Sequence, residues 1–120
     1  MSAYSAAILD RAASPRFEGP LPDATHTGVA GSPGDGPYME MWFELRDGVI
    51  RHAAYRTYGC PAAIACGSMT AQVATGRTIE QVLRLTPRDI TLILGGLPKG
   101  KEHCPQLCVK ALHSAFGNET

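Results

Sequence analysis

The sequence predicts an α+β fold in which a small antiparallel sheet of about three strands has helices packed on one face. Residues 38–58 contain alternating apolar positions around an Asp-Gly pair, which is typical of a β-hairpin. Residues 62–116 contain helix-start signals and an alanine-rich segment instead. Strands that precede helices along a chain favour separate layers. The 120 residues are enough for one hydrophobic core, so we expect residues 1–120 to form a single domain.

The first 37 residues are predicted to contain little regular structure. Residues 4–13 have the composition of a short helix that ends before Pro15, because the residue before a proline disfavours the helical conformation. Residues 14–37 are rich in glycine and proline and are expected to be mostly loop. A short edge strand is expected over residues 25–30.

The hairpin is the clearest local signal. Residues 38–46 alternate, so that one face of the predicted strand is apolar and carries Met39, Met41, Phe43 and Leu45. Asp47-Gly48 is a strong turn signal. Residues 49–58 are expected to return as the partner strand and to end at Gly59.

The helices are expected over four segments: residues 62–74, a segment opened by a Thr78–Gln81 capping box, a segment capped by Thr86 that ends at Gly95-Gly96, and residues 104–116. A capping box supplies hydrogen bonds to amide groups that have no partner at a helix start. Proline directly after Thr86 suits the first turn of a helix.

Composition excludes several function classes. Eleven basic and eleven acidic residues leave no net charge, which gives no basic surface for nucleic acid. The longest apolar stretch, residues 90–97, is too short to span a bilayer, and the N-terminus does not have the pattern of a signal peptide. We therefore expect a cytoplasmic protein, in which thiols stay reduced. Four cysteines in that setting favour metal or sulfur chemistry over disulfides.

Two Cys-Pro steps are the strongest chemical signal in the chain. Cys60-Pro61 and Cys104-Pro105 each stand where a helix is predicted to begin, and His103 is next to the second. Proline favours the first helical position, so each cysteine is expected at or near a helix N-cap. Amide groups and the helix dipole favour a thiolate there. Two thiolates and an imidazole are suitable ligands for a soft or borderline metal, if the fold brings them together.

Less specific readings of these residues stay open at this point. Cys60 could be a small buried residue, and His103 could be a surface histidine beside a core cysteine. A Cys60–His103 nucleophile pair is a further possibility. Cys66 and Cys108 lie within the predicted helices, and core packing is the better interpretation for both.

Three segments resemble the IscU/NifU family of iron–sulfur cluster assembly scaffolds. Thr-Tyr-Gly-Cys-Pro-Ala-Ala-Ile-Ala over residues 57–65 is similar to the segment with the family's second cysteine. Leu-Gly-Gly-Leu-Pro over residues 94–98, followed by Lys-Glu-His-Cys over residues 101–104, is similar to the segment with the third. The beginning of the chain, residues 4–16, also resembles the family. The similarity extends from about residue 4 to residue 116.

The resemblance implies a function that is not enzymatic. A protein of this family would hold a transient [2Fe–2S] cluster at one end of the sheet and pass it to apoproteins. A cysteine desulfurase would be the partner that supplies sulfur. The segment Leu-Pro-Lys-Gly-Lys over residues 97–101 departs from the Leu-Pro-Pro-Val-Lys form that the IscU branch offers to a chaperone, which leaves a chaperone partner open.

The chain departs from the family at the first ligand. The family has Pro-x-Cys-Gly-Asp before the first long strand, whereas this chain has Ser-Pro-Gly-Asp-Gly-Pro over residues 32–37. Counted back from the strand, Asp35 takes the position of the cysteine, whereas a shifted loop would put it in the place of the family's aspartate; either way a carboxylate remains and the cysteine is absent. The ligand set that the resemblance implies here is Asp35, Cys60, His103 and Cys104.

That set leaves a second function open. Two cysteines, a histidine and an aspartate are a reasonable tetrahedral zinc site. The alternative is a zinc-bound sulfur acceptor or regulator of a cysteine desulfurase, with Cys60 or Cys104 receiving a persulfide. A third reading is a divergent domain that serves protein contacts alone and binds no metal.

Overall fold

Three antiparallel strands and four helices make up the part of the chain that the computed structural model describes, which is residues 17–34, 36–58 and 60–117. The elements are β1 (His26–Gly31), β2 (Tyr38–Arg46), β3 (Val49–Thr57), α2 (Pro61–Ala74), α3 (Ile79–Val82), α4 (Pro87–Ile93) and α5 (His103–Phe116). The α+β fold predicted from the sequence is confirmed. The helix expected over residues 4–13 and the residue Asp35 lie outside the described residues.

The sheet is a meander with the order β1-β2-β3. Met41, in the middle of β2, faces Gly28 of β1 and Tyr55 of β3 in the register. Met39, Met41 and Phe43 are fully buried, as the alternation predicts. Asp47 and Gly48 both have positive φ, 54° and 78°, as the turn of a two-residue hairpin requires.

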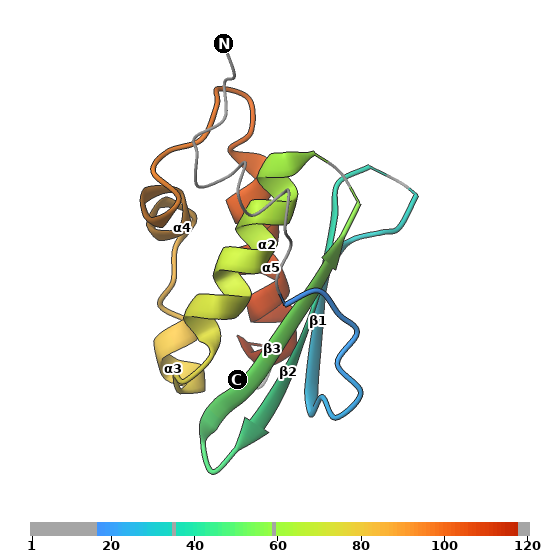
Figure 1. Cartoon of the computed structure of the whole chain (residues 1–120), viewed down its shortest axis with the longest axis vertical. Coiled ribbons are helices and arrows are strands. Elements are labelled where there is room, and N and C mark those ends of the chain that lie inside the picture. The colour runs from blue at the N-terminus through green and yellow to red at the C-terminus, as the bar shows by residue number, and fades with distance from the viewer. Residues whose placement is uncertain (1–16, 35, 59, 118–120) are drawn as a thin grey trace.

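The helices cover one face of this sheet (Figure 1). α5 packs across β1 and β2, α2 packs on β3, and α4 contacts both helices. Two glycines permit this close approach: a Cβ at Gly28 would lie 1.9 Å from the Ala111 carbonyl oxygen of α5, and a Cβ at Gly67 of α2 would lie 2.5 Å from the Tyr55 ring. Both helices therefore pack closely on the same face of the sheet, where α2 and α5 also contact one another.

The predicted helix starts are largely correct. Thr78 Oγ1 accepts from the Gln81 amide at 3.2 Å, and Thr86 Oγ1 accepts from the Asp89 amide at 3.1 Å. α5 begins one residue earlier than expected, because Glu102 is its N-cap residue. Cys104 therefore lies within the first turn of α5 and is not the cap. No helix among the described residues is both long and apolar enough to cross a membrane.

Candidate functional site

The starts of α2 and α5 meet near the end of the sheet where β2 begins and β3 ends (Figure 1). Cys60 is the N-cap residue of α2 and has an extended backbone, with φ −79° and ψ 169°. Cys104 is fully buried, whereas Cys60 is half-buried. The two side chains come from segments 44 positions apart in the chain, yet they lie close enough for Cys60 to raise the pKa of the Cys104 thiol. The fold therefore brings two of the predicted ligands close together.

The surroundings of Cys60 favour loss of its thiol proton. Its partial burial is the largest single effect and raises the pKa of the thiol, whereas the backbone N–H groups of Ala63 and Ala62 lower it. The Lys101 ammonium lowers the pKa further, by its charge and by a hydrogen bond to the sulfur. The net result is a pKa below the usual value for cysteine, which confirms the expectation for a cysteine at a helix start.

Cys104 behaves in the opposite way. Burial raises the pKa of its thiol to about 12, and the charge of Cys60 and the hydrogen bond to it act in the same direction. The expectation that both cysteines would be thiolates is therefore wrong for Cys104, because desolvation outweighs the helix start. Cys60 is therefore the more acidic thiol of the pair, and Cys104 keeps its proton at neutral pH.

His103 is exposed, and its Nε2 lies 3.6 Å from the Cys104 sulfur. No three His, Cys, Asp or Glu side chains in the described parts of the chain converge into a ready metal-binding group. The structure thus brings Cys60 to Cys104 and Cys104 to His103, without assembling a closed set. Asp35, the fourth predicted ligand, is outside the described residues.

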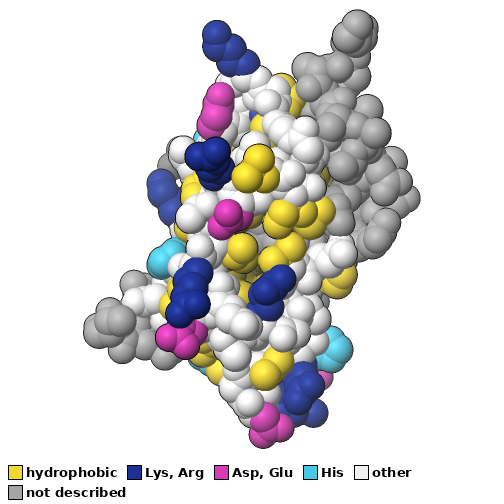
Figure 2. Space-filling view, turned by 90° about the vertical axis from the view of Figure 1, so that its left-hand side faces the viewer, with side chains coloured by type: hydrophobic (Ala, Val, Ile, Leu, Met, Phe, Trp, Pro, Cys, Tyr) yellow, Lys and Arg dark blue, Asp and Glu magenta, His cyan; other side chains and the backbone are white. Residues whose placement is uncertain are grey.

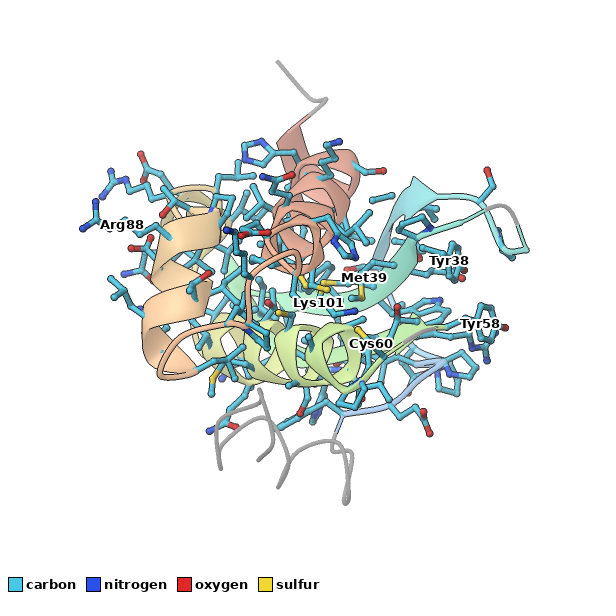
Figure 3. The ribbon with its side chains drawn as sticks, turned by 90° about the horizontal axis from the view of Figure 1, so that it is seen from above. Tyr38, Met39, Tyr58, Cys60, Arg88 and Lys101 are labelled. Atoms are coloured by element: carbon cyan, nitrogen blue, oxygen red, sulfur yellow. The ribbon has the colours of Figure 1, made fainter. Side chains whose placement is uncertain are left out.

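A cleft of about 280 Å³ opens beside this pair. Its lining residues are Gly36, Pro37, Tyr38, Thr57, Tyr58, Cys60, Ala63, Lys101, His103 and Leu107. In Figure 3 Cys60 lies between Lys101, near the middle of the view, and the two tyrosines Tyr38 and Tyr58 at its right. Cys104 lies behind this lining. A ligand that enters the cleft therefore meets the Cys60 sulfur, the Lys101 ammonium and the His103 imidazole first.

Three lining residues were missed by the sequence reasoning. Lys101 stands three positions before Cys104, and a cation so close to a proposed sulfur ligand was a usable signal. Tyr38 begins β2 and Tyr58 follows β3, so the hairpin register alone could have paired them. Their contact with the cleft depends on the loop geometry, which the pattern does not predict.

The other two cysteines are core residues, as predicted. Cys66 and Cys108 are fully buried. Burial raises the pKa of the Cys108 thiol to about 12 and that of Cys66 even further. Both remain thiols at neutral pH and are inert by comparison with Cys60.

The fold and the site define a class of protein: an α+β domain that presents a thiolate, a second sulfur and an imidazole where two helices begin. This donor set suits soft metals and sulfur transfer. The chain belongs to the family of NifU-like N terminal domains, which its sequence matches over residues 3–118.

Curated relatives agree with this assignment. The iron–sulfur cluster assembly scaffold protein IscU 1 of Archaeoglobus fulgidus is 39% identical over 113 residues, covering 94% of this chain and 74% of that protein. The iron–sulfur cluster assembly scaffold protein IscU of Aquifex aeolicus is 38% identical over 115 residues, covering 94% and 73%.

Solved structures support the fold. A protein from Fervidobacterium islandicum, described as an iron–sulfur cluster assembly scaffold for the SUF system, superposes with a TM-score of 0.74 at 17% identity, covering 95% of this chain and 96% of that one. A NifU-like protein (N-terminal) from Brucella abortus has a TM-score of 0.58 at 22% identity, covering 90% and 76%.

Proposed function

We propose that this chain is an iron–sulfur cluster assembly scaffold that holds a transient [2Fe–2S] cluster and passes it to apoproteins. The observation that carries the proposal is the closeness of Cys60 and Cys104 at two adjoining helix starts, with His103 Nε2 3.6 Å from the Cys104 sulfur. Family membership and the names of relatives at 38–39% identity support the same function. The cluster is cargo, so the protein is a carrier and not an enzyme.

The proposed ligands are Cys60, His103, Cys104 and Asp35. Cys60 lines the cleft, and its lowered pKa means that it gives up its proton to a metal more readily than the other three cysteines. Cys104 must give up its proton to bind iron, and metal binding favours that loss because only the thiolate is a ligand. Loading is therefore expected to release protons.

The proposed setting follows from this chemistry. A cysteine desulfurase supplies the sulfur, and apo iron–sulfur proteins receive the cluster. We propose a cytoplasmic setting, because metal binding by Cys60 and Cys104 needs both as reduced thiols. We propose that residues 1–120 act as one domain in this role.

The test is anaerobic reconstitution with Fe²⁺ and sulfide, followed by transfer to an apo ferredoxin. The proposal predicts a visible absorption band on the chain that moves to the ferredoxin on mixing. A chain that takes up no iron and sulfide, or that keeps its cluster in the presence of the acceptor, would contradict the proposed role.

Asp35 is tested separately. An oxygen ligand holds an iron–sulfur cluster less tightly than a thiolate does. Asp35→Cys is expected to lengthen the lifetime of the reconstituted cluster and slow its transfer, whereas Asp35→Ala is expected to weaken metal binding. If Asp35→Ala binds metal as tightly as the parent chain, Asp35 is not a ligand.

The second candidate is a zinc-bound sulfur acceptor that regulates a desulfurase. The thiolate–thiol pair favours it, because Cys60 is a ready nucleophile and Cys104 can resolve a persulfide on it. Metal analysis after anaerobic purification separates the two functions. One zinc and no iron per chain favours this candidate, and iron with sulfide favours the scaffold.

A further inference from the structure

Two tyrosines form a rigid aromatic wall of the cleft. The rings of Tyr38 and Tyr58 stack, with centroids 5.5 Å apart and planes inclined by 15°. Tyr38 is buried, with 4% of its surface exposed, and its hydroxyl donates to the Glu40 carboxylate. Tyr58 is 59% exposed and stands two residues before Cys60. The buried ring is therefore fixed and supports the exposed one.

The Tyr58 side chain contributes little to the stability of the fold. A ring that leaves 59% of its surface in water gains little from burial, yet Tyr38 holds it in one orientation. Preorganised tyrosine side chains of this kind are typical anchors of protein–protein interfaces, because little conformational freedom is lost on binding.

The cleft limits what can reach Cys60. Its volume of about 280 Å³ accommodates one or two side chains but no folded surface. A protein that exchanges sulfur with Cys60 must therefore insert a loop between the tyrosine wall and Lys101. The Lys101 ammonium, which lowers the pKa of Cys60, also favours the thiolate that the partner's cysteine becomes when the S–S bond breaks.

We infer that Tyr58, supported by Tyr38, is the docking anchor for the partner loop that carries a persulfide sulfur to Cys60. The inference rests on the proposed scaffold function and names how the sulfur donor is positioned. Tyr58 is a positioning residue: it contacts the donor loop and takes no part in the bond changes.

The step that Tyr58 would serve is balanced without an oxidant or reductant. The Cys60 thiolate attacks the outer sulfur of the partner's Cys–S–SH group, and a new S–S bond forms on Cys60. The S–S bond to the partner's cysteine breaks, and that cysteine leaves as a thiolate. The outer sulfur keeps its proton throughout the transfer.

The matched control lies on another apolar surface. Figure 2 shows apolar side chains between charged ones on the face where α3 and α4 lie, and Leu92 of α4 is 65% exposed. Figure 3 shows Arg88, also of α4, on the opposite side of the molecule from Tyr38 and Tyr58. Leu92→Ala therefore removes a side chain of similar exposure to Tyr58 that lies away from the cleft.

The experiment compares two sulfur sources on the full chain. The first is the source organism's cysteine desulfurase with L-cysteine, with Cys60 persulfide followed by mass spectrometry at increasing desulfurase concentration. The second is inorganic sulfide with Fe²⁺, which needs no docking loop. The parent chain, Tyr58→Ala, Tyr58→Phe and Leu92→Ala are measured with both.

Tyr58→Ala is expected to raise the half-saturating desulfurase concentration about tenfold or more, with little change in the maximal rate. Tyr58→Phe keeps the aromatic face and is expected to behave like the parent chain, as is Leu92→Ala. All four proteins are expected to reconstitute equally with sulfide.

The outcomes separate this inference from the proposed function. If Tyr58→Ala saturates with desulfurase like the parent chain, or loses sulfide-driven assembly as well, Tyr58 is not a docking anchor. If the parent chain assembles a cluster from sulfide but accepts no sulfur from the desulfurase, the inference about Tyr58 is wrong, while the proposed scaffold function is still supported. If the parent chain assembles no cluster from sulfide, the scaffold function itself fails, whatever Tyr58 does.

Discussion

Helices α2 and α5 each carry one cysteine at the start and a second one deeper, and the two pairs differ in chemistry. Cys60 and Cys104 contact one another at the end of the sheet, beside Lys101 and a cleft, and Cys60 is the one cysteine with a lowered pKa. Cys66 and Cys108 are buried in the core and keep raised pKa values. The same side chain is thus a reactive group or a packing group according to its surroundings.

Cys104 shows which feature decides the difference. It is as fully buried as Cys108, and the pKa of both thiols is raised to about 12. What distinguishes Cys104 is its contact with Cys60 and its 3.6 Å approach to His103. A cysteine that is only buried, such as Cys108, is therefore a core residue. Cys104 is equally buried, but its neighbours Cys60 and His103 make it a possible metal ligand.

The largest expected difference between the pairs is in reactivity. Iodoacetamide at pH 7 is expected to modify Cys60 of the folded apoprotein at least about a thousandfold faster than Cys66 or Cys108, which react only after unfolding at a cost of about 5 kcal/mol or more. Mass spectrometry of peptides from a time course measures the four rates. Equal rates at Cys60 and Cys108 would remove the distinction between the pairs.

Substitution of a core cysteine is expected to lower the free energy of unfolding more than substitution of Cys60, the reverse of the order in reactivity. Cys108→Ser places a hydroxyl in the core and is expected to lower the free energy of unfolding by about 1–3 kcal/mol. Cys60 is half-buried at a helix cap, where serine is also a good cap residue. Cys60→Ser is therefore expected to change the free energy of unfolding by less than about 0.5 kcal/mol. Urea unfolding of the two apoproteins checks this, and a larger loss for Cys60→Ser would contradict it.

The pH dependence of stability follows from the raised pKa values. The Cys108 thiol stays protonated in the folded state up to about pH 12, whereas in the unfolded chain it ionises near its ordinary value of 9.0. The unfolded state then binds fewer protons, so stability is full below about pH 9 and is lost as the pH rises towards 12. Urea midpoints are expected to fall between pH 8 and pH 10, and to fall less steeply in Cys108→Ala.

A flat pH profile in the parent chain would contradict that account. Cys60 contributes with the opposite sign, because its lowered pKa adds stability that is present above about pH 9 and is lost as the pH falls through its folded value. Cys60→Ala is therefore expected to steepen the alkaline loss, and Cys108→Ala to reduce it.

The smallest expected effect concerns Lys101. Lys101→Ala removes the ammonium that hydrogen-bonds the Cys60 sulfur, so the pKa of Cys60 is expected to rise and its alkylation at pH 7 to slow by about two- to tenfold. Lys99→Ala, at an exposed lysine two positions away, is the control and is expected to have no effect. If both variants slow alkylation equally, the effect is one of overall charge.

The sequence predicted the parts of this comparison that depend on local pattern. The hairpin follows from alternation around Asp47-Gly48, and two helix starts follow from the capping box at Thr78 and from the Thr86 cap with proline after it. The core positions of Cys66 and Cys108 were also predicted, since both lie inside helices. Local signals of this kind survive folding because they are satisfied within a few residues.

Tertiary environment accounts for what was missed. The thiol–thiolate split between Cys60 and Cys104 depends on how deeply α5 is buried, which no short motif encodes. The Tyr38–Tyr58 stack and the approach of Lys101 to Cys60 likewise depend on how a loop folds over the sheet end. The position of Asp35 relative to these residues stays a prediction.

The most direct test of the central claim is anaerobic reconstitution of four single variants: Cys60→Ala, Cys104→Ala, Cys66→Ala and Cys108→Ala. Iron, sulfide and visible absorption are measured for each against the parent chain, with circular dichroism to establish that each is folded. Cys60→Ala and Cys104→Ala are expected to lose the cluster, while folded Cys66→Ala and Cys108→Ala are expected to retain it. A cluster that forms normally without Cys60 and Cys104, or that is lost without Cys66, would contradict the central claim.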